Sequence, residues 1–166
     1  MFKIGLVQTI VMLAYSPNAT AATKYDKEAE AAALELNRAQ WSTYSGGSTY
    51  SGGISNYEFK IERICFCPVE YRGPFNVEVL LGEIVSATYE SGKTADSDIV
   101  QGLPTIEGVF GQIEKALDQE YEDLKVTYDE KGGFPTSFWY DTSSMIADDE
   151  MTFRVSNVQL LPSLDL

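Results

Sequence analysis

The sequence predicts an α+β domain of two layers, an antiparallel sheet of about six strands with helices on one face, in the order α-βββ-α-βββ. Two segments have helical patterns, and each is followed by three segments that alternate between apolar and polar residues. The strand segments adjoin one another through turns, and strands linked as hairpins pair antiparallel.

Length and composition indicate one globular domain and exclude several functions. The 166 residues suit a single domain, and 44% of them are apolar. Twenty-five acidic residues against twelve basic ones give a net charge of −13, which disfavours binding to nucleic acids and to anionic membrane surfaces. Histidine is absent, so nucleophile systems with a histidine base and metal sites with an imidazole ligand are excluded.

The N-terminus has the pattern of a secretory signal peptide. Lys3 precedes an apolar run over residues 4–15, and small residues that fit a cleavage site follow. The run is far shorter than the roughly 20 apolar residues of a membrane-spanning helix. We therefore expect removal of residues 1–21, leaving a domain over residues 22–166 without a membrane span. No cysteine follows the run for lipid attachment, so the expected location is secreted or periplasmic.

The first predicted helix covers residues 24–41, which are rich in helix formers and contain neither glycine nor proline. Trp41 is its expected apolar anchor. A tandem repeat of STYSGG follows over residues 42–53 and predicts a flexible Gly/Ser loop. Its Tyr44 and Tyr50 are candidates for a binding surface, against the alternative that the loop has no role.

Three strands are predicted between residues 56 and 89. Residues 56–66 alternate, and one face of this strand carries Tyr57, Phe59, Ile61, Arg63 and Cys65. Residues 74–89 predict a hairpin with Gly82 in its turn. Residues 90–104 are polar and predict a connection.

The second helix and the second group of strands follow the same order. Residues 104–119 have the clearest helical pattern, with Thr105 as the expected N-cap. Its apolar residues recur at helical spacing: Ile106, Val109, Phe110, Ile113 and Leu117. Three strands are expected around residues 124–128, 134–141 and 151–161. The repeated order suggests two similar halves.

Several of these segments together resemble a family of exported bacterial proteins known only as a domain of unknown function. The resemblance extends from about Trp41 to Leu160. It depends on the segments NYEFKIERICFCP, VEVLLGEIVSATY, PTIEGVFGQI, VTYDEKGGFPTSFWYD and DDEMTFRV. The resemblance implies an exported or surface-tethered domain with no assigned reaction and no catalytic residues to transfer to this chain.

Cys65 and Cys67 are the only cysteines in the chain. In an extended strand their Cα atoms would lie about 6.6 Å apart. This is close to the upper limit of about 6.8 Å for a disulfide, so a bridge needs a local kink, which Pro68 is placed to mark.

Three interpretations of this pair stay open: a structural disulfide, two buried free thiols, or a redox or metal site. Zinc would need two further ligands, and the spacing lacks the two intervening residues usual in redox pairs. Export favours the disulfide.

Acidic and aromatic residues near the C-terminus supply the remaining candidates. The segment DTSSMIADDE offers weak calcium candidates in Asp141, Asp148, Asp149 and Glu150. Calcium prefers such oxygen ligands, but the spacing of a calcium loop is missing, and an acidic loop facing water is the alternative. Trp139 alternates with its aromatic neighbours, so it is a candidate binding anchor unless a second layer covers it.

We therefore expect an exported, non-catalytic interaction or structural module. Its expected partner is an unidentified protein or a component of the cell envelope, and we expect no cofactor and no bound metal. The alternative is a thiol redox or metal-handling protein that uses Cys65 and Cys67.

Overall fold

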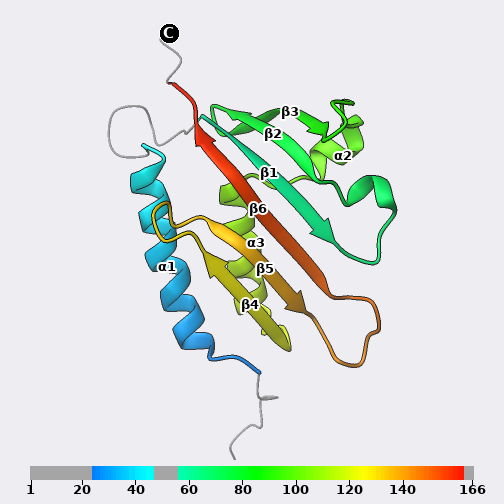
Figure 1. The fold of residues 1–166 in the computed structure, drawn as a ribbon. Coiled ribbons are helices and arrows are strands. Elements are labelled where there is room, and N and C mark those ends of the chain that lie inside the picture. Colours follow the sequence, from blue (N-terminus) through cyan, green and yellow to red (C-terminus); the bar gives the residue numbers. More distant parts are fainter. Residues whose placement is uncertain (1–23, 47–55, 163–166) are drawn as a thin grey trace, which may run out of the picture.

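The computed structural model describes residues 24–46 and 56–162. Six strands form one antiparallel sheet in the order β3-β2-β1-β6-β5-β4, and the long helices α1 and α3 pack against one of its faces (Figure 1). The elements are α1 (Lys27–Tyr44), β1 (Tyr57–Ile64), the 3-10 helix η1 (Val69–Tyr71), β2 (Phe75–Leu80), β3 (Glu83–Tyr89), α2 (Ser97–Gln101), α3 (Ile106–Asp118), β4 (Asp123–Tyr128), β5 (Pro135–Asp141) and β6 (Met151–Leu160).

The predicted α+β class and the order of helices and strands are confirmed. Two short helices were not predicted: η1 lies between two predicted strands, and α2 lies in the segment predicted as a connection. Helix α2 is too short to show a helical period, although it buries Ile99. Helix α1 continues to Tyr44 and so includes the start of the STYSGG repeat, which was expected to be a loop. Residues 47–53 of the repeat and the predicted signal peptide lie outside the described residues.

The two halves of the chain meet at the centre of the sheet through different strands. The first half places its first strand, β1, at the centre of the sheet, whereas the second half places its last strand, β6, there. β1 and β6 then pair antiparallel and join the halves. Across the sheet the strands of both halves follow the same order, β3-β2-β1 and β6-β5-β4, in agreement with the repeated order of elements.

Alternation along each strand separates a buried face from an open one. On β1, Tyr57, Phe59 and Ile61 are buried, while Glu58 between them is exposed. Helix α3 covers the buried face with the apolar residues expected from its period: Ile106, Val109, Phe110, Ile113 and Leu117. The N-cap of α3 is Thr105, as predicted, and its side chain accepts a hydrogen bond from the Gly108 N–H at 3.0 Å.

One carboxylate connects the helical layer to the central strand. Glu107 of α3 accepts hydrogen bonds from Trp41 Nε1 of α1 at 2.8 Å and from the Tyr57 hydroxyl of β1 at 2.6 Å. The Tyr57 oxygen in turn accepts a hydrogen bond from the Ile106 N–H at 3.0 Å. Burial, followed by the charge of Glu107, raises the pKa of Tyr57, so the hydroxyl stays protonated and donates.

The turn between β4 and β5 packs against α1 and accepts hydrogen bonds from it. Gln40 Nε2 donates to the carbonyl oxygens of Glu130 at 2.7 Å and Lys131 at 3.0 Å. Gly133 has φ +74°, and a Cβ added there would lie 2.5 Å from the carbonyl oxygen of Asn37. Only glycine allows this approach of turn and helix without displacing one of them.

We predict that Tyr57→Phe lowers the free energy of unfolding by about 1–3 kcal/mol. The substitution keeps the ring but removes the hydroxyl, so the buried Ile106 N–H loses its acceptor and Glu107 loses a donor. Urea denaturation measures the change. Tyr44→Phe is the matched control, because Tyr44 is 42% exposed, and we expect it to change the free energy by less than about 0.5 kcal/mol. Equal effects of the two variants would contradict the role of the Glu107 network.

Candidate functional site

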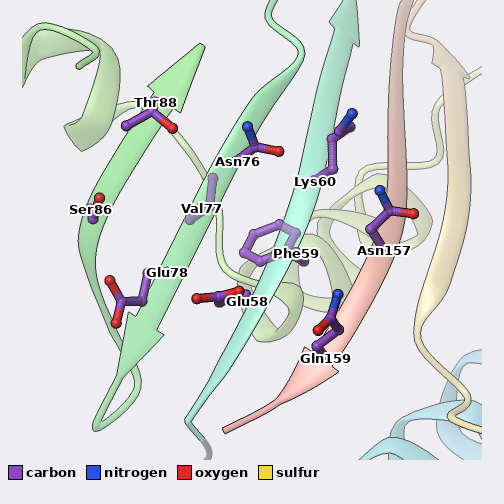
Figure 2. Close-up of a pocket in the computed structure, with 10 residues that line it drawn as sticks. All are labelled: Glu58, Phe59, Lys60, Asn76, Val77, Glu78, Ser86, Thr88, Asn157 and Gln159. Atoms are coloured by element: carbon purple, nitrogen blue, oxygen red, sulfur yellow. The ribbon is translucent and has the colours of Figure 1, made fainter. Parts of the chain in front are cut away.

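The face of the sheet opposite α1 and α3 is open among the described residues. A hollow of about 280 Å³ lies on this face across β3, β2, β1 and β6 (Figure 2). It is lined mainly by charged, amide and hydroxyl side chains: Glu58, Lys60, Asn76, Glu78, Ser86, Thr88, Asn157 and Gln159. Such groups bind polar partners by hydrogen bonds.

Charge in this hollow is distributed unevenly. Glu58 and Glu78 lie directly opposite each other on β1 and β2, an arrangement of like charges that costs free energy in an antiparallel pair. Lys60 Nζ contacts Glu90 Oε1 at 2.7 Å. Glu58 and Glu78 therefore give this part of the hollow a negative charge.

The chain turns sharply where β1 ends. The strand stops at Ile64, and Cys65 and Cys67 follow in a bend, joined by a disulfide with a Cα–Cα distance of 5.3 Å. This is shorter than the separation in an extended strand, in agreement with the kink that a bridge requires. Neither cysteine is a free thiol in this structure. Redox activity of the pair stays a prediction.

The position of the disulfide differs from the expected one. The alternation of β1 predicted Cys65 on the core side with Tyr57, but the regular strand ends one residue earlier. Cys65 is half-buried and lines a hollow together with Ile64 and Trp139. The three-residue ring leaves Phe66 between the two cysteines 81% exposed.

This second hollow, of about 300 Å³, is named the Phe66 patch below. It is lined by Ile64, Cys65, Phe66, Trp139, Asp148, Glu150 and Thr152. Trp139 of β5 is half-buried beside it, with Lys125 Nζ 4.8 Å from a ring centroid, while the neighbouring Phe138 is buried in the core. The patch thus brings together four candidates from the sequence: Cys65, Trp139, Asp148 and Glu150.

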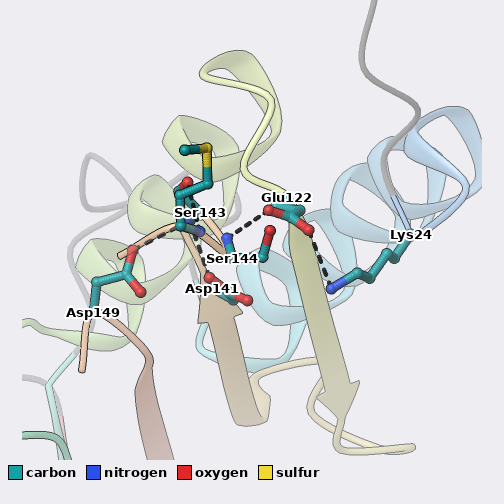
Figure 3. Close-up of polar contacts among 7 residues, drawn as sticks. Lys24, Glu122, Asp141, Ser143, Ser144 and Asp149 are labelled. Atoms are coloured by element: carbon teal, nitrogen blue, oxygen red, sulfur yellow. Dashed lines mark hydrogen bonds and ion pairs between the residues drawn. The ribbon is translucent and has the colours of Figure 1, made fainter. Parts of the chain in front are cut away.

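The loop between β5 and β6 is held by carboxylates (Figure 3). The Ser143 N–H donates to Asp141 Oδ1 at 3.0 Å and to Asp149 Oδ2 at 3.1 Å. The Ser144 N–H donates to Glu122 Oε2 at 2.5 Å, and Glu122 also pairs with Lys24. These bonds position the residues that form one wall of the Phe66 patch.

The four weak calcium candidates do not gather in one place. Asp141 and Asp149 bind the backbone of their own loop, whereas Asp148 and Glu150 line the Phe66 patch. Over residues 24–46 and 56–162, no group of three or more Asp, Glu and Cys side chains is arranged to hold a metal ion.

The aromatic candidates of the STYSGG repeat are separate from the patch. Tyr44 ends α1, and its ring centroid lies 6.0 Å from that of Trp41. Tyr50 lies outside the described residues. The exposure of Phe66 and the polar hollow of Figure 2 were not predicted; the only signal for Phe66 was its place between two cysteines.

A comparison with known families agrees with this description. Residues 33–160 match the model of a family of unknown function, DUF6174. The chain belongs to this family. The DUF6174 match includes every strand and all residues of the Phe66 patch, and it confirms the resemblance to a domain of unknown function.

Comparisons at the level of single proteins give no further relatives. No curated protein and no solved structure matches the chain. In the described part of this DUF6174 chain, no helix is long and apolar enough to cross a membrane.

We predict that the stabilising effect of Glu122 depends on pH. The side chain and backbone of Ser144, and then Lys24, lower the pKa of Glu122 from 4.5 to about 2. Because the folded pKa is the lower one, the contribution of this carboxylate is complete above pH 4.5 and is lost as the pH falls towards 2. Wild type therefore unfolds at a higher temperature than Glu122→Gln near neutral pH, and the gap closes in acid.

Thermal unfolding followed by circular dichroism measures this gap. Glu83→Gln, at an exposed position at the start of β3, is the control near neutral pH and changes the midpoint little. A gap between wild type and Glu122→Gln that stays constant from neutral pH to pH 2 contradicts the assignment.

Proposed function

We propose that this chain is an exported, non-catalytic binding module, and that the Phe66 patch contacts a basic segment of a partner protein. The observation that carries the proposal is Phe66 itself. A phenylalanine that is 81% exposed gains free energy when a partner removes it from water. Phe66 lies between the two cysteines of the disulfide, which restricts its backbone. Little conformational entropy is therefore lost when it binds a partner.

The surroundings of Phe66 define the chemistry of the partner. Trp139 adds an aromatic surface, and aromatic anchors dominate the binding energy of protein interfaces. Asp148 and Glu150 place negative charge at the edge of this apolar surface. A segment with an apolar side chain beside a lysine or arginine is complementary to this combination, and the net charge of −13 favours its approach.

The residue types of the chain and the bonds of its acidic candidates support a binding role. The chain has no histidine to act as a general base. Two of the acidic candidates, Asp141 and Asp149, accept hydrogen bonds from the Ser143 N–H. Export is supported by the signal-like N-terminus and by the disulfide, which persists in oxidising compartments.

We predict that Phe66→Ser removes this binding. Random peptides displayed on phage are selected on the wild-type domain, and we expect enrichment of sequences with a lysine or arginine next to an apolar residue. The best peptide is then synthesised, and its affinity is measured by calorimetry. Loss of an aromatic anchor costs about 2 kcal/mol or more, so we expect affinity to fall about 30-fold or more for Phe66→Ser and Trp139→Ala.

Val85→Ser is the matched control for this experiment. Val85 lies on the edge strand β3 and is 54% exposed, so its substitution removes a similar exposed apolar side chain away from the patch. We expect unchanged peptide affinity. Selection of acidic peptides instead contradicts the proposed function. So does turnover of an ester, glycan or peptide substrate that is lost with one carboxylate mutation.

We predict that Cys65→Ser/Cys67→Ser still folds but binds the selected peptide more weakly. The bridge closes a very small loop, so its loss removes only about 1.5 kcal/mol from the free energy of unfolding by the chain-entropy estimate. Phe66 then has to be ordered on binding, which lowers peptide affinity about three- to tenfold. Urea denaturation and calorimetry separate the two effects. Unchanged affinity in a variant that folds shows that the bridge does not prepare Phe66 for binding.

A further inference from the structure

A separate cavity lies on the helical side of the sheet, away from the Phe66 patch. It has a volume of about 310 Å³ and opens between α3, the end of β1 and strands β5 and β6. Two cations, Arg63 and Lys115, and the amide of Gln112 face it together with the rings of Tyr121, Tyr140 and Phe153. No carboxylate among the described residues lines it, although the chain carries 25 acidic residues.

Arg63 is the central group of this cavity. Its guanidinium carbon Cζ lies 6.0 Å from the ring centroid of Phe153, and its Nη2 donates a hydrogen bond to the carbonyl oxygen of Gly102. Nε is buried and has no hydrogen-bond partner. Within the described residues, no carboxylate lies within ion-pair distance of Arg63, whereas Arg38 and Arg154 each pair with a glutamate.

A half-buried guanidinium without a counter-ion is unfavourable, because burial removes hydration that no charge replaces. Burial accordingly lowers the pKa of Arg63, yet arginine remains protonated in proteins. The fork of N–H donors on a guanidinium matches the two oxygens of a carboxylate. Lys115, at the exposed rim on α3, adds a second positive charge.

The other lining groups favour an organic anion over a small inorganic one. The Tyr140 hydroxyl donates to Met151 Sδ at 3.6 Å, and a thioether sulfur is a weak acceptor that an anionic oxygen displaces. The Tyr121 and Tyr140 rings, with centroids 5.3 Å apart, form an apolar wall with Phe153. Such a mixture of rings and a few polar groups is typical of small-molecule pockets.

We propose that this cavity binds the carboxylate of a ligand with an aromatic or apolar body. Arg63 binds the two carboxylate oxygens, Lys115 adds positive charge at the rim, and the tyrosine rings contact the body of the ligand. The carboxylate belongs either to a free organic acid or to the C-terminal residue of a peptide. This site is on the opposite face of the sheet from the Phe66 patch and does not depend on the function proposed for that patch.

The test is an NMR titration of the protein with benzoate, with benzamide as the uncharged probe of the same shape. A pentapeptide ending in phenylalanine, as free acid and as C-terminal amide, forms the second arm. We expect saturable benzoate binding with a dissociation constant below about 10 mM, a modest value for a ligand of this size. Benzamide and the peptide amide should bind at least about tenfold more weakly.

Variants locate the binding. Arg63→Gln should lower benzoate affinity about tenfold or more, and Lys115→Gln about two- to fivefold. Arg154→Gln is the matched control, because Arg154 is an exposed arginine of β6 that pairs with Glu62, and it should leave affinity unchanged. Phe66→Ser should also have no effect. If Arg63→Gln does not fold, the test uses Lys115→Gln alone, because Lys115 is exposed and its substitution is compatible with folding.

The two arms identify the source of the carboxylate. Binding of benzoate without the peptide acid indicates a free organic acid, and tighter binding of the peptide acid indicates a chain terminus. Three results overturn the proposal: no saturable binding of benzoate or of the peptide acid at 10 mM, equal binding of benzamide, or a benzoate affinity unaffected by both Arg63→Gln and Lys115→Gln.

Discussion

The requirement that the sheet bury only one face determines most of this structure. Alternating residues on β1 and β2 send aromatic and branched side chains to one side, where α1 and α3 cover them. The other side is left to charged and amide side chains, and the hollow of Figure 2 is a direct result. The same constraint divides the two proposed sites, because Trp139 and Arg63 point to opposite faces from strands of a single sheet.

The two layers are held in register by few polar contacts. Glu107 bonds a tryptophan of α1 and a tyrosine of β1 at the start of α3, so three elements meet at one carboxylate. Apolar packing is non-directional, and these directional bonds therefore specify how the helices lie over the strands. The Phe66 patch depends similarly on Glu122 and Asp149, whose bonds to loop backbone keep its acidic wall in place.

Much of the fold follows from local pattern, but the sites do not. The period of α3 and its Thr105 cap could be predicted because both are local properties of consecutive residues. The end of β1 at Ile64 could not be predicted, because the alternation continues in the sequence while the disulfide and Pro68 bend the chain.

The meeting of Phe66 with Trp139 depends on the pairing of β1 with β6 and of β6 with β5. Local alternation determines which face of the sheet a residue occupies, but not which residue of a distant strand lies beside it. The sequence pattern places Arg63 on the inner face of β1, but only the structure shows that no carboxylate of the described residues lines the cavity beside it.

The contact between α1 and the β4–β5 turn has a consequence for the order in which the protein is assembled during synthesis. Gln40 and its acceptor Glu130 are 90 residues apart, and Glu107 and Tyr57 also follow α1 in the chain. The ribosome therefore releases the first helix long before the turn that fastens it. Until then Leu34 and Trp41 lack their final partners, and α1 remains an amphipathic segment available to chaperones.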